Sequence, residues 1–94
     1  MQYQPEWSKS VYHLFVVIPE NKNDFENHLK RSGINPAYHY PVPCHLQKAY
    51  QNLGYKNGDF PNAEYLAENC ISLPMYAELS KEEVENVIKA VNLF

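Results

Sequence analysis

Apolar residues recur along this chain with two different periods, which together predict an alternation of strands and helices. Residues 11–18 are rich in β-branched and aromatic side chains and are followed by Pro19, as is typical of a strand. Because both alternating faces of this strand are largely apolar, we expect it to be central or covered on both sides. Shorter strands are predicted at residues 34–40 and at residues 71–73, the second stopped by Pro74.

Helical spacing and capping residues predict a helix after the first strand and another at the end of the chain. The first is expected to begin at Asn23, with Glu26 completing a capping-box-like pair, and to end at Gly33. The last has the clearest start signal, because Ser80 and Glu83 are spaced as a capping box.

Two middle helices are expected over residues 46–53, closed by Gly54, and over residues 62–70, with a tight turn at residues 56–59. The apolar stripes expected to be buried are Phe25 with Leu29, then Ala63, Leu66, Ala67 and Cys70, and finally Val84, Val87, Ile88 and Val91.

This order of elements predicts one α+β domain spanning residues 1–94. We expect a small three- to four-stranded sheet with helices packed mainly on one face. Residues 1–9 are a polar lead-in, in which Trp7 is expected to pack on the edge of the domain.

Composition argues against two classes of protein, namely nucleic-acid-binding proteins and membrane proteins. The formal net charge of −3 argues against non-specific binding to nucleic acid, which needs a basic face. The longest apolar run, residues 14–18, is too short to span a bilayer, and the first residues lack the apolar region of a signal peptide. We therefore expect a cytoplasmic protein without a membrane partner, with Cys44 and Cys70 as free thiols.

The segment of residues 38–45 concentrates chemically active side chains on a loop that its prolines stiffen. One interpretation is a binding loop, and the other is a rigid connection whose aromatic residues simply pack. A zinc site of His39, Cys44 and His45 is a further alternative, although it lacks an obvious fourth ligand. A nucleophilic pair of Cys44 with either histidine is conceivable, but the sequence shows no orienting acid nearby.

The remaining histidines are expected to be structural or solvated: His13 lies in an apolar strand, and His28 lies on a helix. No glycine-rich phosphate loop is present, and no lysine position promises the burial that an imine-forming amine needs. The sequence therefore indicates no catalytic residue, metal ligand or cofactor ligand.

The string from His39 to Tyr50, HYPVPCHLQKAY, resembles the H-Y-P-x-P-x-H-L-Q-x-A-Y signature of the DegT/DnrJ/StrS family of sugar aminotransferases. The resemblance extends over roughly residues 8–92. Its other motifs are Tyr12–Val17, Gly33-Ile34, Leu53–Tyr55, Gly58–Glu64 and Leu73–Met75.

The resemblance implies the fold of aspartate-aminotransferase-like enzymes, in which a large cofactor domain precedes a small C-terminal domain. Such enzymes use pyridoxal phosphate (PLP) to aminate a keto-sugar attached to a nucleotide, and they work as homodimers with shared active sites. The lysine that holds the cofactor belongs to the large domain. Carried over to this chain, the family's loop makes His39, Tyr40 and His45 the candidate substrate-binding residues. Tyr38 departs from the family, since many relatives have a small residue there.

The resemblance implies that this chain is the C-terminal small domain, without the cofactor domain, and inactive by itself. Its expected partners are the missing large domain, a nucleotide-sugar substrate and further copies of itself in a homo-oligomer. Separation from the large domain is expected to leave an apolar face uncovered. The alternative is a stand-alone sugar-nucleotide-binding or protein-interaction module without catalysis.

Overall fold

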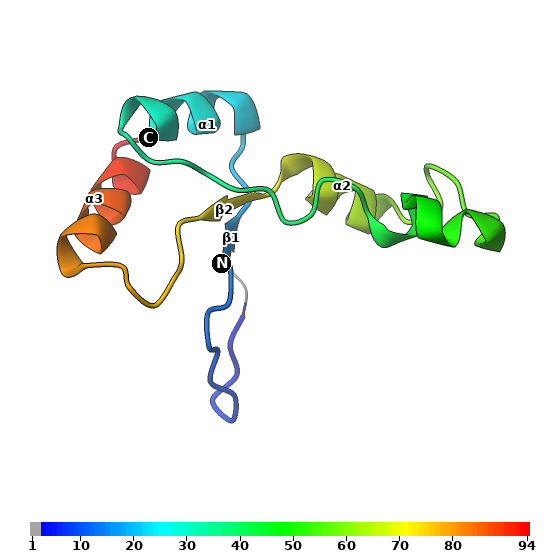
Figure 1. Cartoon of the computed structure of the whole chain (residues 1–94), viewed down its shortest axis with the longest axis horizontal. Coiled ribbons are helices and arrows are strands. Elements are labelled where there is room, and N and C mark those ends of the chain that lie inside the picture. The colour runs from blue at the N-terminus through cyan, green and yellow to red at the C-terminus, as the bar shows by residue number, and fades with distance from the viewer. Residues whose placement is uncertain (1–2) are drawn as a thin grey trace.

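The computed structural model describes residues 3–94, and their architecture is α+β, as predicted. In chain order the elements are β1 (Phe15–Val17), α1 (Lys22–Arg31), the 3₁₀ helices η1 (Cys44–Leu46) and η2 (Lys48–Leu53), α2 (Pro61–Asn69), β2 (Ile71–Leu73) and α3 (Lys81–Asn92). Helices α1 and α3 lie on one side of the β1–β2 ribbon, whereas α2 and the two 3₁₀ helices extend away from it as an arm (Figure 1).

The sheet is smaller than the sequence predicted. Strands β1 and β2 form a two-stranded antiparallel sheet in which Val16 pairs with Ser72. The expected strand at residues 34–40 is reduced to one bridge, in which Ala37 and Ser72 exchange backbone hydrogen bonds of 3.0 and 2.8 Å. Pro36 lacks an N–H group, so a regular ladder cannot extend through this segment.

The covered strand is β2 rather than β1. All three residues of β2 are buried, because it lies between β1 and the Ala37 bridge. The expectation of a covered first strand was wrong: Val16 and Ile18 are exposed, and Val11 lies outside β1 and is also exposed.

The core lies between α1, α3 and the sheet. Its buried members are Phe25, Leu29, Ile34, Ile71, Leu73 and Ala90, with Phe15, Val17, Val87 and Val91 packed against them. On α3 the buried stripe is therefore rotated from the predicted one, since Val84 and Ile88 are exposed and Ala90 is buried. Ala90 lies in the same core cluster as Phe25 and Leu29 of α1, a placement that hydrophobic spacing does not reveal.

The two main helix starts were predicted with different success. The capping box is present at α3: Glu83 N–H donates to Ser80 Oγ, and the Glu83 carboxylate accepts from Ser80 N–H. Helix α1, however, begins two residues earlier than expected. Its cap is Asn21, whose side-chain oxygen accepts from Asp24 N–H at 3.1 Å, so Asn23 lies inside the helix.

The helix expected over residues 46–53 is instead two short 3₁₀ segments. The extended backbone of Gln47 separates them (φ −71°, ψ 144°) and prevents a continuous α-helix. Gly54 ends the second segment with φ 76°, as its predicted role requires.

Three expectations about single residues also changed. Trp7 is 88% exposed and does not pack on the domain edge. His13 is exposed and lies outside β1. His28 is half-buried rather than solvated: its Nε2 lies 2.8 Å from the carbonyl oxygen of Ala90, and its ring packs against Phe94, which ties α1 to the end of α3.

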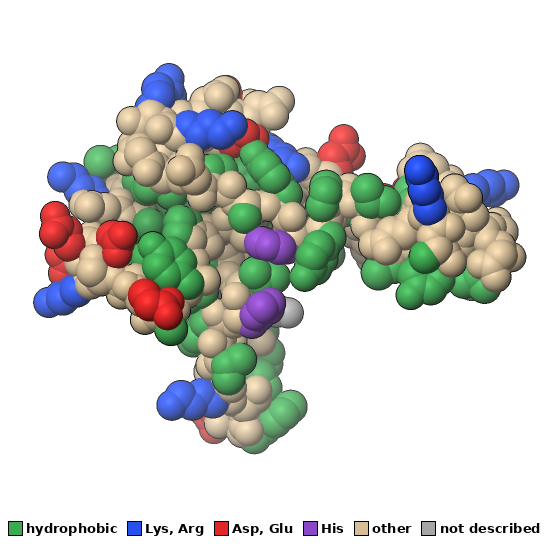
Figure 2. All heavy atoms as spheres, viewed as in Figure 1, with side chains coloured by type: hydrophobic (Ala, Val, Ile, Leu, Met, Phe, Trp, Pro, Cys, Tyr) green, Lys and Arg blue, Asp and Glu red, His purple; other side chains and the backbone are tan. Residues whose placement is uncertain are grey.

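The molecule is elongated, with principal extents of 47 × 36 × 22 Å and a Cα radius of gyration of 15.7 Å. A compact domain of this length would have a radius of about 12 Å. Figure 2 shows hydrophobic side chains exposed on the arm and along the N-terminal extension. In the described residues, no helix is long and apolar enough to cross a membrane.

Candidate functional site

The loop at residues 39–47 and helix α2 enclose an open groove of about 480 Å³, the candidate functional site. The three predicted substrate-binding residues, His39, Tyr40 and His45, all line it. The other lining residues are mostly apolar: Val42, Pro43, Cys44, Gln47, Phe60, Ala63, Leu66, Ala67 and Cys70. The stripe of α2 that was predicted to be core is therefore the wall of this groove, and of its members only Cys70 is buried.

His39 is anchored to β2. Its Nδ1 lies 2.9 Å from the hydroxyl oxygen of Ser72, a residue that is only 1% exposed. The thiol of Cys70 donates to the backbone carbonyl of His39 at 3.6 Å. His39 is therefore hydrogen-bonded both to the sheet and to the residue that follows α2. The ring of Tyr40 stands edge-on to the imidazole, with 5.4 Å between centroids, and remains exposed.

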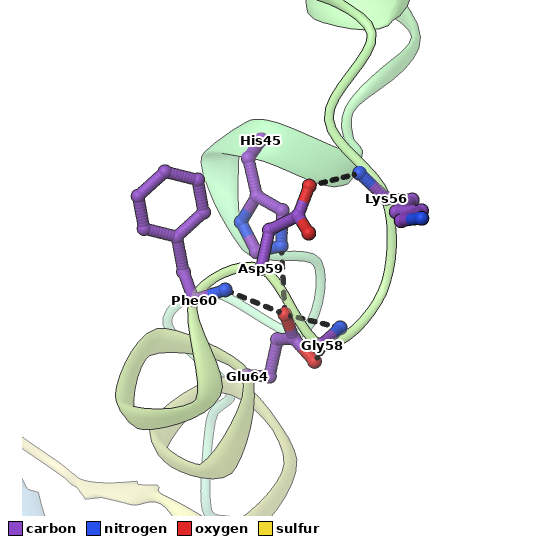
Figure 3. A network of polar contacts seen from close by, with 6 residues as sticks. All are labelled: His45, Lys56, Gly58, Asp59, Phe60 and Glu64. Carbon is purple, nitrogen blue, oxygen red and sulfur yellow. Dashed lines mark hydrogen bonds and ion pairs between the residues drawn. The ribbon is translucent and has the colours of Figure 1, made fainter.

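His45 is anchored to α2 by a polar network (Figure 3). Its Nε2 lies 2.9 Å from Oε1 of Glu64, and the two side chains are only 7% and 18% exposed. The backbone N–H of Gly58 donates to both carboxylate oxygens at 2.9 Å, and that of Phe60 donates to Oε1 at 3.2 Å. The Phe60 ring packs on the imidazole with 4.8 Å between centroids.

Local sequence explains why this network forms. Pro61 occupies the first turn of α2, where its missing N–H is tolerated, and Glu64 follows in the same turn. From there the carboxylate reaches back to the N–H groups of Gly58 and Phe60, and Gly58 adopts the φ of 95° that this turn needs. These donors hold the pKa of Glu64 below its ordinary value, with the Gly58 N–H as the main cause and His45 contributing.

Tyr38 does not line the groove but faces α1 instead. The ammonium group of Lys22 lies 5.1 Å from the centre of its ring. A hydrogen bond with Glu26 raises the pKa of the Tyr38 hydroxyl. Tyr38 therefore contributes to the packing between the loop and α1.

The two chemical alternatives for the loop receive no geometric support. Among residues 3–94, no group of three or more histidine, cysteine or acidic side chains is placed to hold a metal ion. The imidazoles of His39 and His45 bond to Ser72 and Glu64 respectively, and not to Cys44.

Glu64 is the site residue that the sequence analysis missed. It lies 19 positions from its histidine partner and resembled any acidic residue in a first helical turn. A signal was present in the arrangement Gly58-Asp59-Phe60-Pro61, which ends a turn at the helix start and leaves N–H donors for a carboxylate.

The chain matches known proteins over almost its whole length. Residues 1–92 match the model of the DegT/DnrJ/EryC1/StrS aminotransferase family. The chain is 44% identical over 82 residues to the erythromycin biosynthesis sensory transduction protein EryC1 of Saccharopolyspora erythraea, covering 87% of this chain and 22% of that protein. It is 40% identical over 81 residues to the dTDP-3-amino-3,4,6-trideoxy-alpha-D-glucose transaminase of Streptomyces venezuelae, covering 86% of this chain and 21% of that protein.

Solved structures agree with the sequence matches. DesV of S. venezuelae, solved in complex with a ketimine intermediate, matches with a TM-score of 0.80 and 38% identity, covering 90% of this chain and 23% of DesV. A putative sugar aminotransferase from Streptococcus pneumoniae, solved in its PMP form, matches with a TM-score of 0.66 and 35% identity, covering 83% of this chain and 21% of that protein. This chain therefore spans between a fifth and a quarter of the length of these relatives.

Enzymes of the matched family use PLP, which reacts through a lysine amine. The described residues do not fit this cofactor alone, because no lysine among them lines the groove. Lys22, the one half-buried lysine of the described residues, donates a hydrogen bond to the carbonyl oxygen of Glu68. The pKa of Lys30 is raised by a hydrogen bond with Glu26, whereas an imine-forming lysine needs a lowered pKa. The chain's lysines are Lys9, Lys22, Lys30, Lys48, Lys56, Lys81 and Lys89.

Proposed function

Because this chain belongs to the DegT/DnrJ/EryC1/StrS aminotransferase family, we propose that it is the small C-terminal domain of a PLP-dependent enzyme that aminates a keto-sugar carried on a nucleotide. The observation that carries the proposal is the family match over residues 1–92. The loop at residues 39–47, which lies within this match, forms one wall of the groove. A relative named as a dTDP-sugar transaminase supports the nucleotide-linked substrate.

In this proposal the groove helps to hold the substrate, and the chemistry takes place on the large domain. Imidazole and phenol groups form hydrogen bonds with sugar hydroxyls, and the exposed ring of Tyr40 can also stack on a sugar or base. His39 is held by buried Ser72 and His45 by half-buried Glu64, and these contacts set the positions of the two imidazoles before a ligand arrives.

The surface of the described residues supports a larger context. Their solvent-accessible area is 7695 Å², whereas a compact protein of 11.0 kDa exposes about 5,600 Å². The excess includes large apolar side chains such as Val11, Tyr12 and Ile88. We propose that the large domain and a second copy of the enzyme cover this surface, which makes the working protein a homo-oligomer.

A chimera tests the function. The matching segment of the S. venezuelae dTDP-sugar transaminase is replaced by this chain, and transamination is measured. We expect an active chimera in which Tyr40→Ala or His39→Ala raises KM about three- to tenfold, the range for one lost hydrogen bond. Tyr65→Ala is the matched control, since Tyr65 is an exposed tyrosine of α2 outside the groove. A folded chimera without activity would refute the proposed function.

A second experiment tests the expectation that the chain alone does not transaminate. The chain is mixed with PLP, reduced with borohydride and digested, and the modified lysines are identified by mass spectrometry. We expect weak labelling spread over exposed lysines, because none is desolvated in the groove. Saturable labelling of a single lysine would contradict this expectation.

A stand-alone module that binds sugar nucleotides or a protein is the second candidate, because His39, Tyr40 and His45 line an open groove whose wall includes exposed apolar side chains. It predicts that a dTDP-linked sugar shifts the backbone amide resonances of residues 39–47 in the isolated chain, or that the chain forms a stable complex with another polypeptide. Flat titrations in both assays would eliminate it.

A further inference from the structure

The carboxylate of Glu64 lies at the centre of the polar network beside the groove (Figure 3). Its Oε1 faces Nε2 of His45 at 2.9 Å, and N–H groups of Gly58 and Phe60 approach the same carboxylate at 2.9 and 3.2 Å. One carboxylate therefore contacts all three partners at the same time, which its acceptor sites allow.

The chemistry of the carboxylate decides how His45 is protonated. With its pKa lowered by these donors, Glu64 is ionised at neutral pH and can only accept hydrogen bonds. A contact of 2.9 Å between an ionised carboxylate and Nε2 requires a proton on Nε2. Neutral His45 then has no proton on Nδ1.

We infer that Glu64 is a positioning residue that holds His45 in its Nε2–H tautomer and thereby leaves Nδ1 as a hydrogen-bond acceptor. If the groove binds the sugar, as the proposed function holds, neutral His45 accepts from a ligand hydroxyl or N–H group. It does not donate to a phosphate oxygen in that state.

Within the part of the chain that the structure describes, His39, the other histidine of the groove, has no carboxylate partner that would fix its tautomer. His39 Nδ1 faces the hydroxyl of Ser72, which can either donate or accept, so this contact alone permits both tautomers. The two histidines therefore differ in what they offer a ligand, although both belong to the same loop and line the same groove.

Nitrogen NMR of the full chain tests the inference directly. Long-range proton–nitrogen correlation spectra distinguish a protonated ring nitrogen from an unprotonated one, and His45→Asn assigns the signals. The spectra are recorded without ligand and at alkaline pH, so that the neutral rings are observed. We expect wild-type His45 to show unprotonated Nδ1 and protonated Nε2. In Glu64→Ala, both nitrogens should move to intermediate values, because the neutral ring then samples both tautomers.

Glu68→Ala is the matched control, since it removes an exposed acidic residue of α2 that does not contact His45. Unchanged amide resonances of Leu29 and Ile71 show that each variant is folded. Wild-type His45 with averaged nitrogens, or with its proton on Nδ1, would overturn the inference, as would a folded Glu64→Ala variant that keeps a single Nε2–H tautomer. The NMR measurement uses no sugar and therefore does not depend on the proposed function. If the chimera proves inactive, the NMR result still decides whether Glu64 fixes the tautomer of His45.

Discussion

Replacing Leu29 with alanine tests the packing that holds the groove in place. Leu29 is 0% exposed and contributes to the core cluster that also contains Ile71 and Leu73 of β2. The same strand carries Ser72, which anchors His39. Removing a fully buried leucine side chain loses its transfer free energy and leaves a cavity, which costs about 3 kcal/mol.

That cost is large for this chain. A domain of 94 residues is stable by about 5–14 kcal/mol, and the extended shape and excess surface place this one toward the lower end. We expect Leu29→Ala to lower the unfolding free energy by about 3 kcal/mol and the melting temperature by roughly 15 °C. Urea titration followed by far-ultraviolet circular dichroism measures the first quantity, and a thermal scan measures the second.

Ile88→Ala is the control, because Ile88 is 53% exposed although the sequence pattern placed it on the buried stripe of α3. Its removal should cost no more than about 1 kcal/mol, since roughly half of its apolar area stays in water. Equal losses for Ile88→Ala and Leu29→Ala would refute the burial pattern on which this reasoning rests, as would a loss below about 1 kcal/mol for Leu29→Ala.

Three further variants address caps, turns and acid sensitivity. Ser80→Ala removes the side-chain half of the capping box at α3 and should cost about 1 kcal/mol in urea titrations, and no change in midpoint would contradict that role. Gly54→Ala should cost about 1–2 kcal/mol from its φ of 76° alone, because a Cβ there meets no atom within 4 Å. The lowered pKa of Glu64 stabilises the folded state above the ordinary glutamate value of about 4.3, and this contribution is lost as pH falls through the folded pKa. Acid titration of Glu64→Gln should therefore show a smaller loss of stability below about pH 4.3 than wild type, and an unchanged acid slope would refute that assignment.

Features that depend on a few neighbouring residues were readable in the sequence. The capping box at Ser80 and Glu83, the glycine that ends η2 and the proline-stiffened loop each need only local backbone geometry. The family signature in residues 39–50 likewise placed His39, Tyr40 and His45 on one candidate surface, and the structure brings all three to one groove.

Features that depend on which segments meet were decided by tertiary packing. Hydrophobic spacing favoured Ile88 over Ala90 as a buried position of α3. The two residues point to nearly opposite sides of the helix, and only tertiary packing shows that Ala90 is the buried one. The pairing of His45 with Glu64 spans 19 positions and arises from the placement of α2 beside the loop. A single bridge at Ala37 replaces the expected third strand, because Pro36 lacks the N–H donor that a regular ladder needs. Strand β2 is buried because the chain places it between β1 and this bridge, and its own three residues do not reveal that position.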